Sequence, residues 1–276
     1  MATRSTRRKV WSAVGAHLPL ALVAVVTCFP FFVMLVLSVQ PGKPFSLPGS
    51  LLPTSIDLSE YTRLLGRGEM VQWMLNTTIY SVLGVVLVLA LASLAAYAFA
   101  KVDFPGRGLM FWLIIAMMMI PYHLTLIPKF LLVSELGGLD TYWGLVLPTV
   151  ANVQALFLMR QFIAGIPNEL IEAAKVDGAG ELRIFWSIIL PQLKPIMATL
   201  AVFVFLWHWN DFLWPLVALQ SGDMYTLTVG LASLNAEETS LATVMTGSVI
   251  TLVPIFIIFL FAQNWFVRGV TMSGIK

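Results

Sequence analysis

Long apolar segments separated by short polar ones dominate the chain from residue 17 onward. A helix needs about 20 mostly apolar residues to cross the hydrocarbon core of a bilayer. Six segments meet this requirement, at residues 17–39, 74–99, 108–131, 142–163, 186–219 and 243–266. The fifth is long enough to bend, and Pro191, Pro195 and Pro215 provide breakpoints within it. The pattern therefore predicts an all-α integral membrane protein with six transmembrane helices.

The positions of the basic residues orient this bundle, because Lys and Arg are concentrated in cytoplasmic loops. With the N-terminus inside, the cytoplasmic segments contain Arg4, Arg7, Arg8, Lys9, Lys101, Arg107, Arg160, Lys175, Arg183, Lys194, Arg268 and Lys276. The outside keeps Lys43, Arg63, Arg67 and Lys129, and the outer loop 221–241 has no basic residue. We therefore expect a cytoplasmic segment at 1–16, a six-helix domain over 17–266 and a cytoplasmic tail at 267–276.

Composition supports a membrane protein and excludes several other classes. Apolar residues make up 59% of the chain and charged residues 11%, whereas soluble domains carry about 25% charged residues. The net charge of +2 is too small to indicate nucleic-acid binding, and the single cysteine excludes an internal disulfide framework. No phosphate-binding loop of the G-x-x-x-x-G-K-[ST] type occurs. We therefore expect no ATP site, no other bound cofactor and no metal site in this chain.

The segment between the fourth and fifth predicted spans, residues 167–185, carries the most specific pattern. It contains Glu172-Ala173-Ala174, then Gly178 after three intervening residues, and then the sequence Ile188-x-Leu190-Pro191 after nine more intervening residues. Leu170, Ala173 and Ala174 fall on one face at helical spacing, and Gly178 permits a turn. An ordinary surface helix is the alternative interpretation. The whole pattern resembles the EAA loop of bacterial ABC importer permeases.

Other segments resemble one branch of that family, the maltose-type carbohydrate-uptake permeases, and specifically their shorter, G-subunit-like partner. These segments are Asn76-Thr77, Phe104-Pro105-Gly106-Arg107, the run from Trp209 to Leu216 and the C-terminus from Arg268 to Lys276. In this chain Ser273 precedes Gly274, and the final glycine of the family's usual tail is missing. Docking of the tail is therefore left open.

The resemblance implies a permease that moves a sugar or sugar-like solute inward by alternating access across the bacterial cytoplasmic (inner) membrane. It implies as partners a second permease, an ATPase dimer that binds ATP and Mg²⁺, an external substrate-binding protein and membrane lipid. Coupling to the ATPase is implied for Glu172, Ala173, Ala174, Asp177 and Gly178, within a cytoplasmic coupling helix. Contact with the binding protein is implied for Asn235, Glu237 and Glu238. Glycerol phosphate or a polyol is the alternative cargo.

A membrane enzyme is the alternative of a different class. It would require a cluster of catalytic groups at one depth in the membrane. His123 and Asp211 lie on different predicted spans, and the sequence contains no nucleophile motif. We therefore expect a transport subunit and not an enzyme.

Polar side chains inside the predicted spans are candidates for the solute path, because charges at membrane depth are costly and face partners or water. They are Lys129, Asn152, Gln154, Trp209, Asn210 and Asp211. Asp211 is equally compatible with a pathway role and with stabilising a bend. Lys129 is interpreted first as reaching the membrane interface, with pairing to Glu135 or to an acidic substrate as alternatives. Asn152 and Gln154 could face the pathway or join helices.

Overall fold

The computed structural model describes residues 3–40, 49–52, 55–236 and 240–272. Within these ranges the chain is helical and contains no strand, as the sequence predicts. It divides into two compact units. The first comprises Met1–Gly68 and Leu231–Val253, and the second comprises Glu69–Gly230 and Pro254–Lys276.

Three described helices are long and apolar enough to cross a membrane without interruption. They are His17–Ser38 within α1 (Thr3–Ser38), α3 (Glu69–Lys101), and Leu241–Phe261 within α14 (Leu241–Met272). Three further candidates are pairs of helices bent by more than 40°: Arg107–Met119 with Tyr122–Glu135, Tyr142–Thr149 with Val153–Ala164, and Glu181–Gln192 with Lys194–Trp209. By length and composition, the described residues therefore provide three spans, or six if each bent pair is one span.

The third and fourth segments were predicted as continuous spans, and the structure corrects this. α4 (Arg107–Ala116) continues into a 3₁₀ turn, and the chain then bends by 98° before α5 (Leu126–Glu135). The bend falls at Pro121, and Ile120 before it is extended, as expected of a residue that precedes proline. α6 (Tyr142–Val146) and α7 (Val153–Ala164) meet at 50°, after a turn that contains Pro148.

The fifth segment bends, as its prolines predict. α9 (Glu181–Ile184) leads through a π-helical turn into α10 (Leu190–Gln192), and α11 (Lys194–Trp209) follows at 75°. Pro191 and Pro195 lie on either side of this break. The segment does not continue to residue 219, because α11 ends at Trp209 and a separate helix, α12 (Leu213–Ala218), follows.

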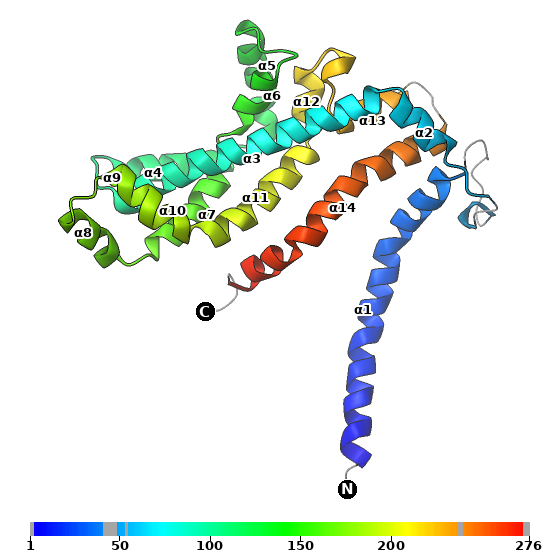
Figure 1. Cartoon of the computed structure of the whole chain (residues 1–276), viewed down its shortest axis with the longest axis horizontal. Coiled ribbons are helices and arrows are strands. Elements are labelled where there is room, and N and C mark those ends of the chain that lie inside the picture. Colours follow the sequence, from blue (N-terminus) through cyan, green and yellow to red (C-terminus); the bar gives the residue numbers. More distant parts are fainter. Residues whose placement is uncertain (1–2, 41–48, 53–54, 237–239, 273–276) are drawn as a thin grey trace. The chain divides into compact units, whose positions relative to one another are not determined.

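The core of the second unit forms where α3 packs against α7 and α11 (Figure 1). Ala92 and Ala96 are one turn apart on α3 and are buried in this core. Small side chains at i and i+4 allow helix backbones to approach closely. Met159 and Ile163 of α7 contribute fully buried side chains to the same cluster.

The first unit joins the end of α1 to α2 (Ser59–Gly66) and to the start of α14 by hydrogen bonds. The hydroxyl groups of Ser38 and Tyr61 lie 2.7 Å apart, and Thr246 donates to the backbone oxygen of Ser38 over 3.1 Å. Glu60 accepts from Thr243 over 3.0 Å.

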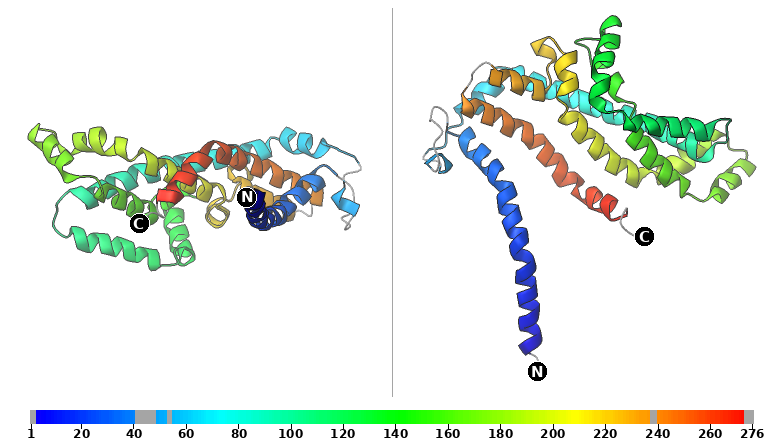
Figure 2. Two further views of the ribbon diagram at one scale, coloured as in Figure 1. Left: turned by 90° about the horizontal axis from the view of Figure 1, so that it is seen from below. Right: turned by 180° about the vertical axis from the view of Figure 1, so that it is seen from behind.

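The helix α8 (Asn168–Val176) and its neighbour α9 lie at the end of the second unit where α3 finishes (Figure 1). Two further views keep this yellow-green pair of helices at the same extremity (Figure 2). The segment predicted to couple the chain to an ATPase therefore lies at one end of the second unit (Figure 1).

Candidate functional site

The sequence around α8 explains why a short helix forms there and stops. Pro167 precedes the first turn, where its missing N–H is not needed, and Glu169 in that turn suits the helix dipole. At the other end Gly178 has φ +79°. The N–H of Gly178 bonds Lys175 O over 3.0 Å, and the N–H of Ala179 bonds Ala174 O over 2.9 Å. These two bonds form a Schellman motif, which ends the helix at a glycine.

The residues of the EAA motif divide between two faces of α8. Glu172 and Ala173 are exposed, as are Asp177 and Gly178 at the end of the helix. Ala174 is buried together with Ile171 in the core of the second unit. The expectation that Leu170, Ala173 and Ala174 share one docking face therefore needs correction: Leu170 and Ala173 face outward, and Ala174 anchors the helix to its own chain.

Two residues of α3 hold the loop at both ends of α8. The ammonium group of Lys101 donates to Ile166 O and to Asn168 Oδ1, each over 2.6 Å. One turn earlier, the hydroxyl of Tyr97 donates to Glu181 Oε2 over 2.5 Å. Side chains four positions apart lie on the same helix face. The end of α3 is thus tied to the residues that precede and follow α8.

Glu181 also forms an ion pair with Lys175, whose Nζ lies 2.8 Å from Oε1. This hydrogen bond raises the pKa of the Lys175 ammonium. Lys175 therefore stays charged at neutral pH, and the contribution of this pair would disappear only when an alkaline pH rises through that raised pKa. The ion pair closes the turn between α8 and α9.

The first turns of α3 hold a different segment. Trp73 donates through its indole N–H to Gly222 O over 2.9 Å, and Asn76 Nδ2 donates to Asp223 O over 2.7 Å and to Tyr225 O over 2.9 Å. Asn76 and Tyr97 are separated by about 30 Å of helix at 1.5 Å per residue. This length matches the hydrocarbon core of a bilayer. α3 therefore connects the α8 loop to part of the predicted outer loop.

Asp211 lies in the break between α11 and α12 and has partners within its own chain. Tyr80 donates to Asp211 Oδ2 over 2.8 Å, and Thr228 donates to the backbone oxygen of Asp211 over 2.7 Å. Asn210 is exposed and donates to Leu206 O over 2.7 Å. Trp209 is buried and stacks on Phe205, with ring centroids 5.3 Å apart. Through these contacts all three residues stabilise the bend between α11 and α12.

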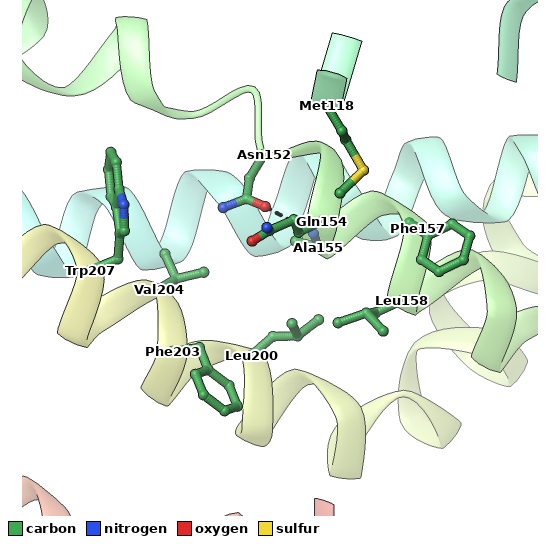
Figure 3. Close-up of a pocket in the computed structure, with 10 residues that line it drawn as sticks. All are labelled: Met118, Asn152, Gln154, Ala155, Phe157, Leu158, Leu200, Phe203, Val204 and Trp207. Atoms are coloured by element: carbon green, nitrogen blue, oxygen red, sulfur yellow. Dashed lines mark hydrogen bonds between the residues drawn. The ribbon is translucent and has the colours of Figure 1, made fainter. Parts of the chain in front are cut away.

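Two cavities adjoin α7 and α11. One of about 500 Å³ is lined by Met118, Asn152, Gln154, Ala155, Phe157, Leu158, Leu200, Phe203, Val204 and Trp207 (Figure 3). The Asn152 oxygen accepts from the backbone N–H of Ala155 over 2.8 Å and caps α7. The Gln154 side chain lies beside it and reaches into the cavity (Figure 3). Asn152 thus combines a cap with a position on a cavity wall.

The second cavity, of about 390 Å³, shares Met118, Asn152, Gln154 and Trp207 with the first. It also includes Lys129, Tyr122, Thr125 and Thr149 in its lining. Of the six side chains predicted for the solute path, the structure brings Lys129, Asn152 and Gln154 together here. Trp209, Asn210 and Asp211 do not line either cavity.

Several residues of these sites were not identified from the sequence. Tyr97, Tyr80, Tyr122 and Thr228 received no role, and Lys101 was counted only as a positive charge. Tyr80 and Tyr97 are hydroxyl-bearing side chains inside a long apolar segment. A buried phenol needs a hydrogen-bond partner, so the need for partners was recognisable from the sequence. The identity of the partners was not.

The predicted binding-protein contacts lie mostly outside the described residues. Glu237 and Glu238 are in the undescribed segment, and Asn235 lies near the end of α13 (Leu227–Ala236) in a part where side chains are not described. Within the described residues, no group of three or more His, Cys, Asp or Glu side chains is arranged to hold a metal ion.

Comparison with known proteins identifies the chain's family. Residues 89–272 match the family described as "Binding-protein-dependent transport system inner membrane component". The chain belongs to this family. It is therefore a membrane transport subunit and not an enzyme, and the resemblance drawn from the EAA pattern is confirmed.

Several relatives cover almost the whole permease. It is 36% identical over 261 residues to the arabinooligosaccharides transport system permease protein AraQ of Halalkalibacterium halodurans, covering 93% of this chain and 94% of the relative. It is 33% identical over 267 residues to the sn-glycerol-3-phosphate transport system permease protein UgpE of Yersinia pestis, covering 93% and 95%. The names of both relatives are those of transport permeases.

Solved structures show the same fold. The permease matches a chain of a bacterial ABC transporter involved in the import of the acidic polysaccharide alginate, with a TM-score of 0.81 and 28% identity, covering 96% of this chain and 99% of that chain. A second match, with a TM-score of 0.71 and 16% identity, is to a chain of the alginate ABC transporter in complex with an alginate pentasaccharide-bound periplasmic protein. It covers 96% of both chains.

Proposed function

We propose that this permease moves a sugar or sugar-like solute inward, driven by a separate ATPase dimer and supplied by an external substrate-binding protein. It would act as a heterodimer with a second permease in the bacterial inner membrane. The proposed topology has six spans, counting each bent pair as one, with both termini and residues 167–185 in the cytoplasm. Relatives that carry arabinooligosaccharides or belong to an alginate importer support a carbohydrate cargo.

The observation that carries the proposal is the attachment of α8. Glu172 and Ala173 are exposed on a short helix whose two flanks are tied to Lys101 and Tyr97 of α3. A helix docked in a cleft of the ATPase could therefore pass a displacement to α3. At its other end α3 also holds Gly222, Asp223 and Tyr225. A displacement of α3 caused by closing of the ATPase dimer would therefore be passed to residues on the outer side of the membrane. Alternating access follows from such rigid-body movement.

Glycerol phosphate or a polyol is the second candidate cargo for the same machinery. The relative from Yersinia pestis, whose name specifies sn-glycerol-3-phosphate, favours it. The two candidates share the coupling loop and differ only in the solute. The cavity beside α7 and α11 contains aromatic and amide side chains that suit hydroxyl-rich solutes in either case.

The proposal is tested by ATP-dependent uptake in vesicles that contain the permease with and without its partner subunits. Glu172→Lys should leave the permease pair in the membrane but prevent co-purification of the ATPase, because it reverses the charge on the exposed face of α8. Glu135→Lys is the matched control, since Glu135 is an exposed carboxylate at the end of α5. Normal uptake and normal ATPase recovery with Glu172→Lys would contradict the coupling role.

We further propose that the outer loop 221–241 meets the binding protein through Asn235, Glu237 and Glu238. The loop contains acidic residues and no Lys or Arg, which would favour a basic patch on the partner. Deleting residues 235–239 should abolish the stimulation of ATP hydrolysis by the binding protein while basal hydrolysis persists. Unchanged stimulation would leave the loop as a simple connector.

A further inference from the structure

The ammonium group of Lys129 on α5 lies among aromatic rings and forms no ion pair with a described residue. Its Nζ is 4.4 Å from the ring centroid of Tyr122 and 5.2 Å from that of Trp214. The side chain is half-buried. Within the described part of the chain no carboxylate lies within ion-pairing distance of Nζ, so the pairing with Glu135 considered from the sequence does not occur. Aromatic faces attract a cation, but less strongly than an anion does.

The cavity of about 390 Å³ places this charge beside groups that suit a sugar ring. Tyr122 and Trp207 supply aromatic surface, and Asn152 and Gln154 supply amides. Lys129 is the one charged side chain among its lining residues. The phenolic oxygen of Tyr122 is buried and has no hydrogen-bond partner in the described structure. The buried hydroxyl is not exposed to the cavity, so this wall offers the charge of Lys129 beside aromatic rings and amides.

Asp211 interacts electrostatically with Lys129 but forms no direct ion pair with it. Its carboxylate accepts the hydrogen bond of Tyr80, and it is absent from the cavity lining. A half-buried ammonium with aromatic neighbours and no carboxylate at ion-pairing distance favours a ligand that brings its own negative charge. The adjoining cavity of about 500 Å³ is lined mainly by apolar side chains such as Leu200 and Phe203 (Figure 3). Lys129 therefore provides a positive charge for a ligand in the smaller cavity only.

We propose that Lys129 binds an oxyanion, a carboxylate or a phosphate, carried by the transported solute. The inference rests on the proposed transport function and deepens it by naming the cargo as an acidic sugar or a sugar-like phosphate. The solved relative described as importing an acidic polysaccharide and the relative named for sn-glycerol-3-phosphate support this class.

An anionic lipid headgroup presents the same chemistry, so the experiment must separate the two sources. The permease, assembled with its partner subunits, is placed in nanodiscs of phosphatidylcholine alone. A small amine-reactive reagent is applied, and modification of Lys129 is followed by mass spectrometry of its peptide. Galacturonate and galactose form a matched pair of probes that differ in the carboxylate, and glycerol 3-phosphate tests the phosphate.

Galacturonate or glycerol 3-phosphate should slow the modification of Lys129 several-fold, and galactose should not. Lys194, an exposed lysine at the start of α11, is the internal control and should react equally in all samples. Equal protection by galactose, no protection by either anion, or no modification of Lys129 under any condition would overturn the proposal. Protection by phosphatidylglycerol nanodiscs without added solute would assign the site to lipid and would also overturn it.

A substitution series gives an independent readout. Lys129→Met should lower uptake of an anionic probe roughly ten-fold or more, the loss expected for a hydrogen bond to a charged group, while Lys129→Arg retains most of the rate. Co-purification of the ATPase should be unchanged in both variants. Failure of the transport proposal would instead appear in the unmodified complex, as absent ATP-dependent uptake or absent ATPase, whatever the labelling of Lys129 shows.

Discussion

The hydroxyl group of Tyr97 on α3 donates a hydrogen bond to the carboxylate of Glu181 on α9, over 2.5 Å. Glu181 in turn pairs with Lys175 at the end of α8. A residue of a long apolar helix thereby fixes the turn that follows the EAA motif. Lys101, one turn after Tyr97 on α3, holds the start of the same loop by bonding Ile166 and Asn168. The orientation of α8 thus depends on two polar contacts with α3 in addition to its apolar face.

Removing these contacts should uncouple ATP hydrolysis from transport. Tyr97→Phe and Lys101→Met each delete hydrogen bonds, and those that involve a charged group contribute about 1.5–3 kcal/mol. We expect ATPase binding to persist through the exposed face of α8, while uptake per ATP hydrolysed falls several-fold. The measurement is uptake and hydrolysis in the same vesicles. Tyr225→Phe is the control, because no hydrogen bond of its hydroxyl occurs in the described structure, and it should keep the normal ratio. An unaltered ratio in Tyr97→Phe would remove α3 from the coupling path.

The turn after α8 should depend on one glycine and not on its neighbour. Gly178 has φ +79°, a conformation that costs a residue with a side chain about 1–2 kcal/mol. Gly180 has φ −75° and nothing within 4 Å of an added Cβ. Gly178→Ala should therefore weaken ATPase recovery, and Gly178→Pro should abolish it by also removing the N–H that bonds Lys175. Gly180→Ala should behave as wild type. Equal recovery for Gly178→Pro and Gly180→Ala would show that α8 does not need this ending.

The sequence predicted the helical class and the helix at the EAA motif because both depend on local patterns. The apolar runs have lengths set by the bilayer, and the ending of α8 requires a residue of positive φ, which Gly178 provides. The breaks at Pro121 and Pro148 were not predicted, although proline marks a possible bend. Long helices with proline, such as α14 with Pro254, also occur unbroken, and neighbouring helices decide between the two outcomes.

The hydrogen-bond partners of the buried tyrosines could not be predicted from sequence patterns. Tyr97 and Glu181 are 84 positions apart, and Tyr80 and Asp211 are 131 apart. No local rule pairs them, because their contact depends on how α3 packs against α9 and α11. The same limit applies to Lys129, whose aromatic neighbour Trp214 comes from α12. The types of residue were recognisable as costly in a membrane, but their arrangement became clear only in three dimensions.

Asp211 and Tyr80 should behave as a coupled pair. Tyr80 is fully buried, so Asp211→Leu removes the carboxylate that accepts from its hydroxyl, at a cost of about 1–3 kcal/mol. Asp211→Asn keeps an acceptor, and we expect assembly with weaker transport. The double variant Tyr80→Phe with Asp211→Leu should recover part of the stability lost by Asp211→Leu, since both polar partners are gone. The test compares the thermal stability of the purified permease pair with its initial uptake rate. Additive losses in the double variant, or full uptake by Asp211→Leu, would exclude a functional pair.

α3 and α11 pack closely against each other beside that pair. Gly84 on α3 lies so close to the ring of His208 on α11 that an added Cβ would come within 2.4 Å of Nε2. The ring cannot move aside cheaply, because Nδ1 lies 2.8 Å from Val204 O, Nε2 lies 3.1 Å from Thr149 Oγ1, and the side chain is buried. Alanine usually favours a helix over glycine by about 1 kcal/mol, so propensity alone predicts that Gly84→Ala stabilises.

We expect Gly84→Ala to destabilise the protein instead, with a loss of ~1–3 kcal/mol in the free energy of unfolding from overpacking. The reason is that α3 and α11 must separate or His208 must give up a hydrogen bond. Gly108→Ala is the matched control: Gly108 is also helical and has nothing within 4 Å of an added Cβ, so it should be neutral or slightly stabilising. Both variants are compared by thermal unfolding of the purified permease pair in one detergent. A Gly84→Ala variant as stable as Gly108→Ala would mean that α3 and α11 do not pack this closely. Movement of α3 would then not be transmitted rigidly to α11 and the bend at Asp211.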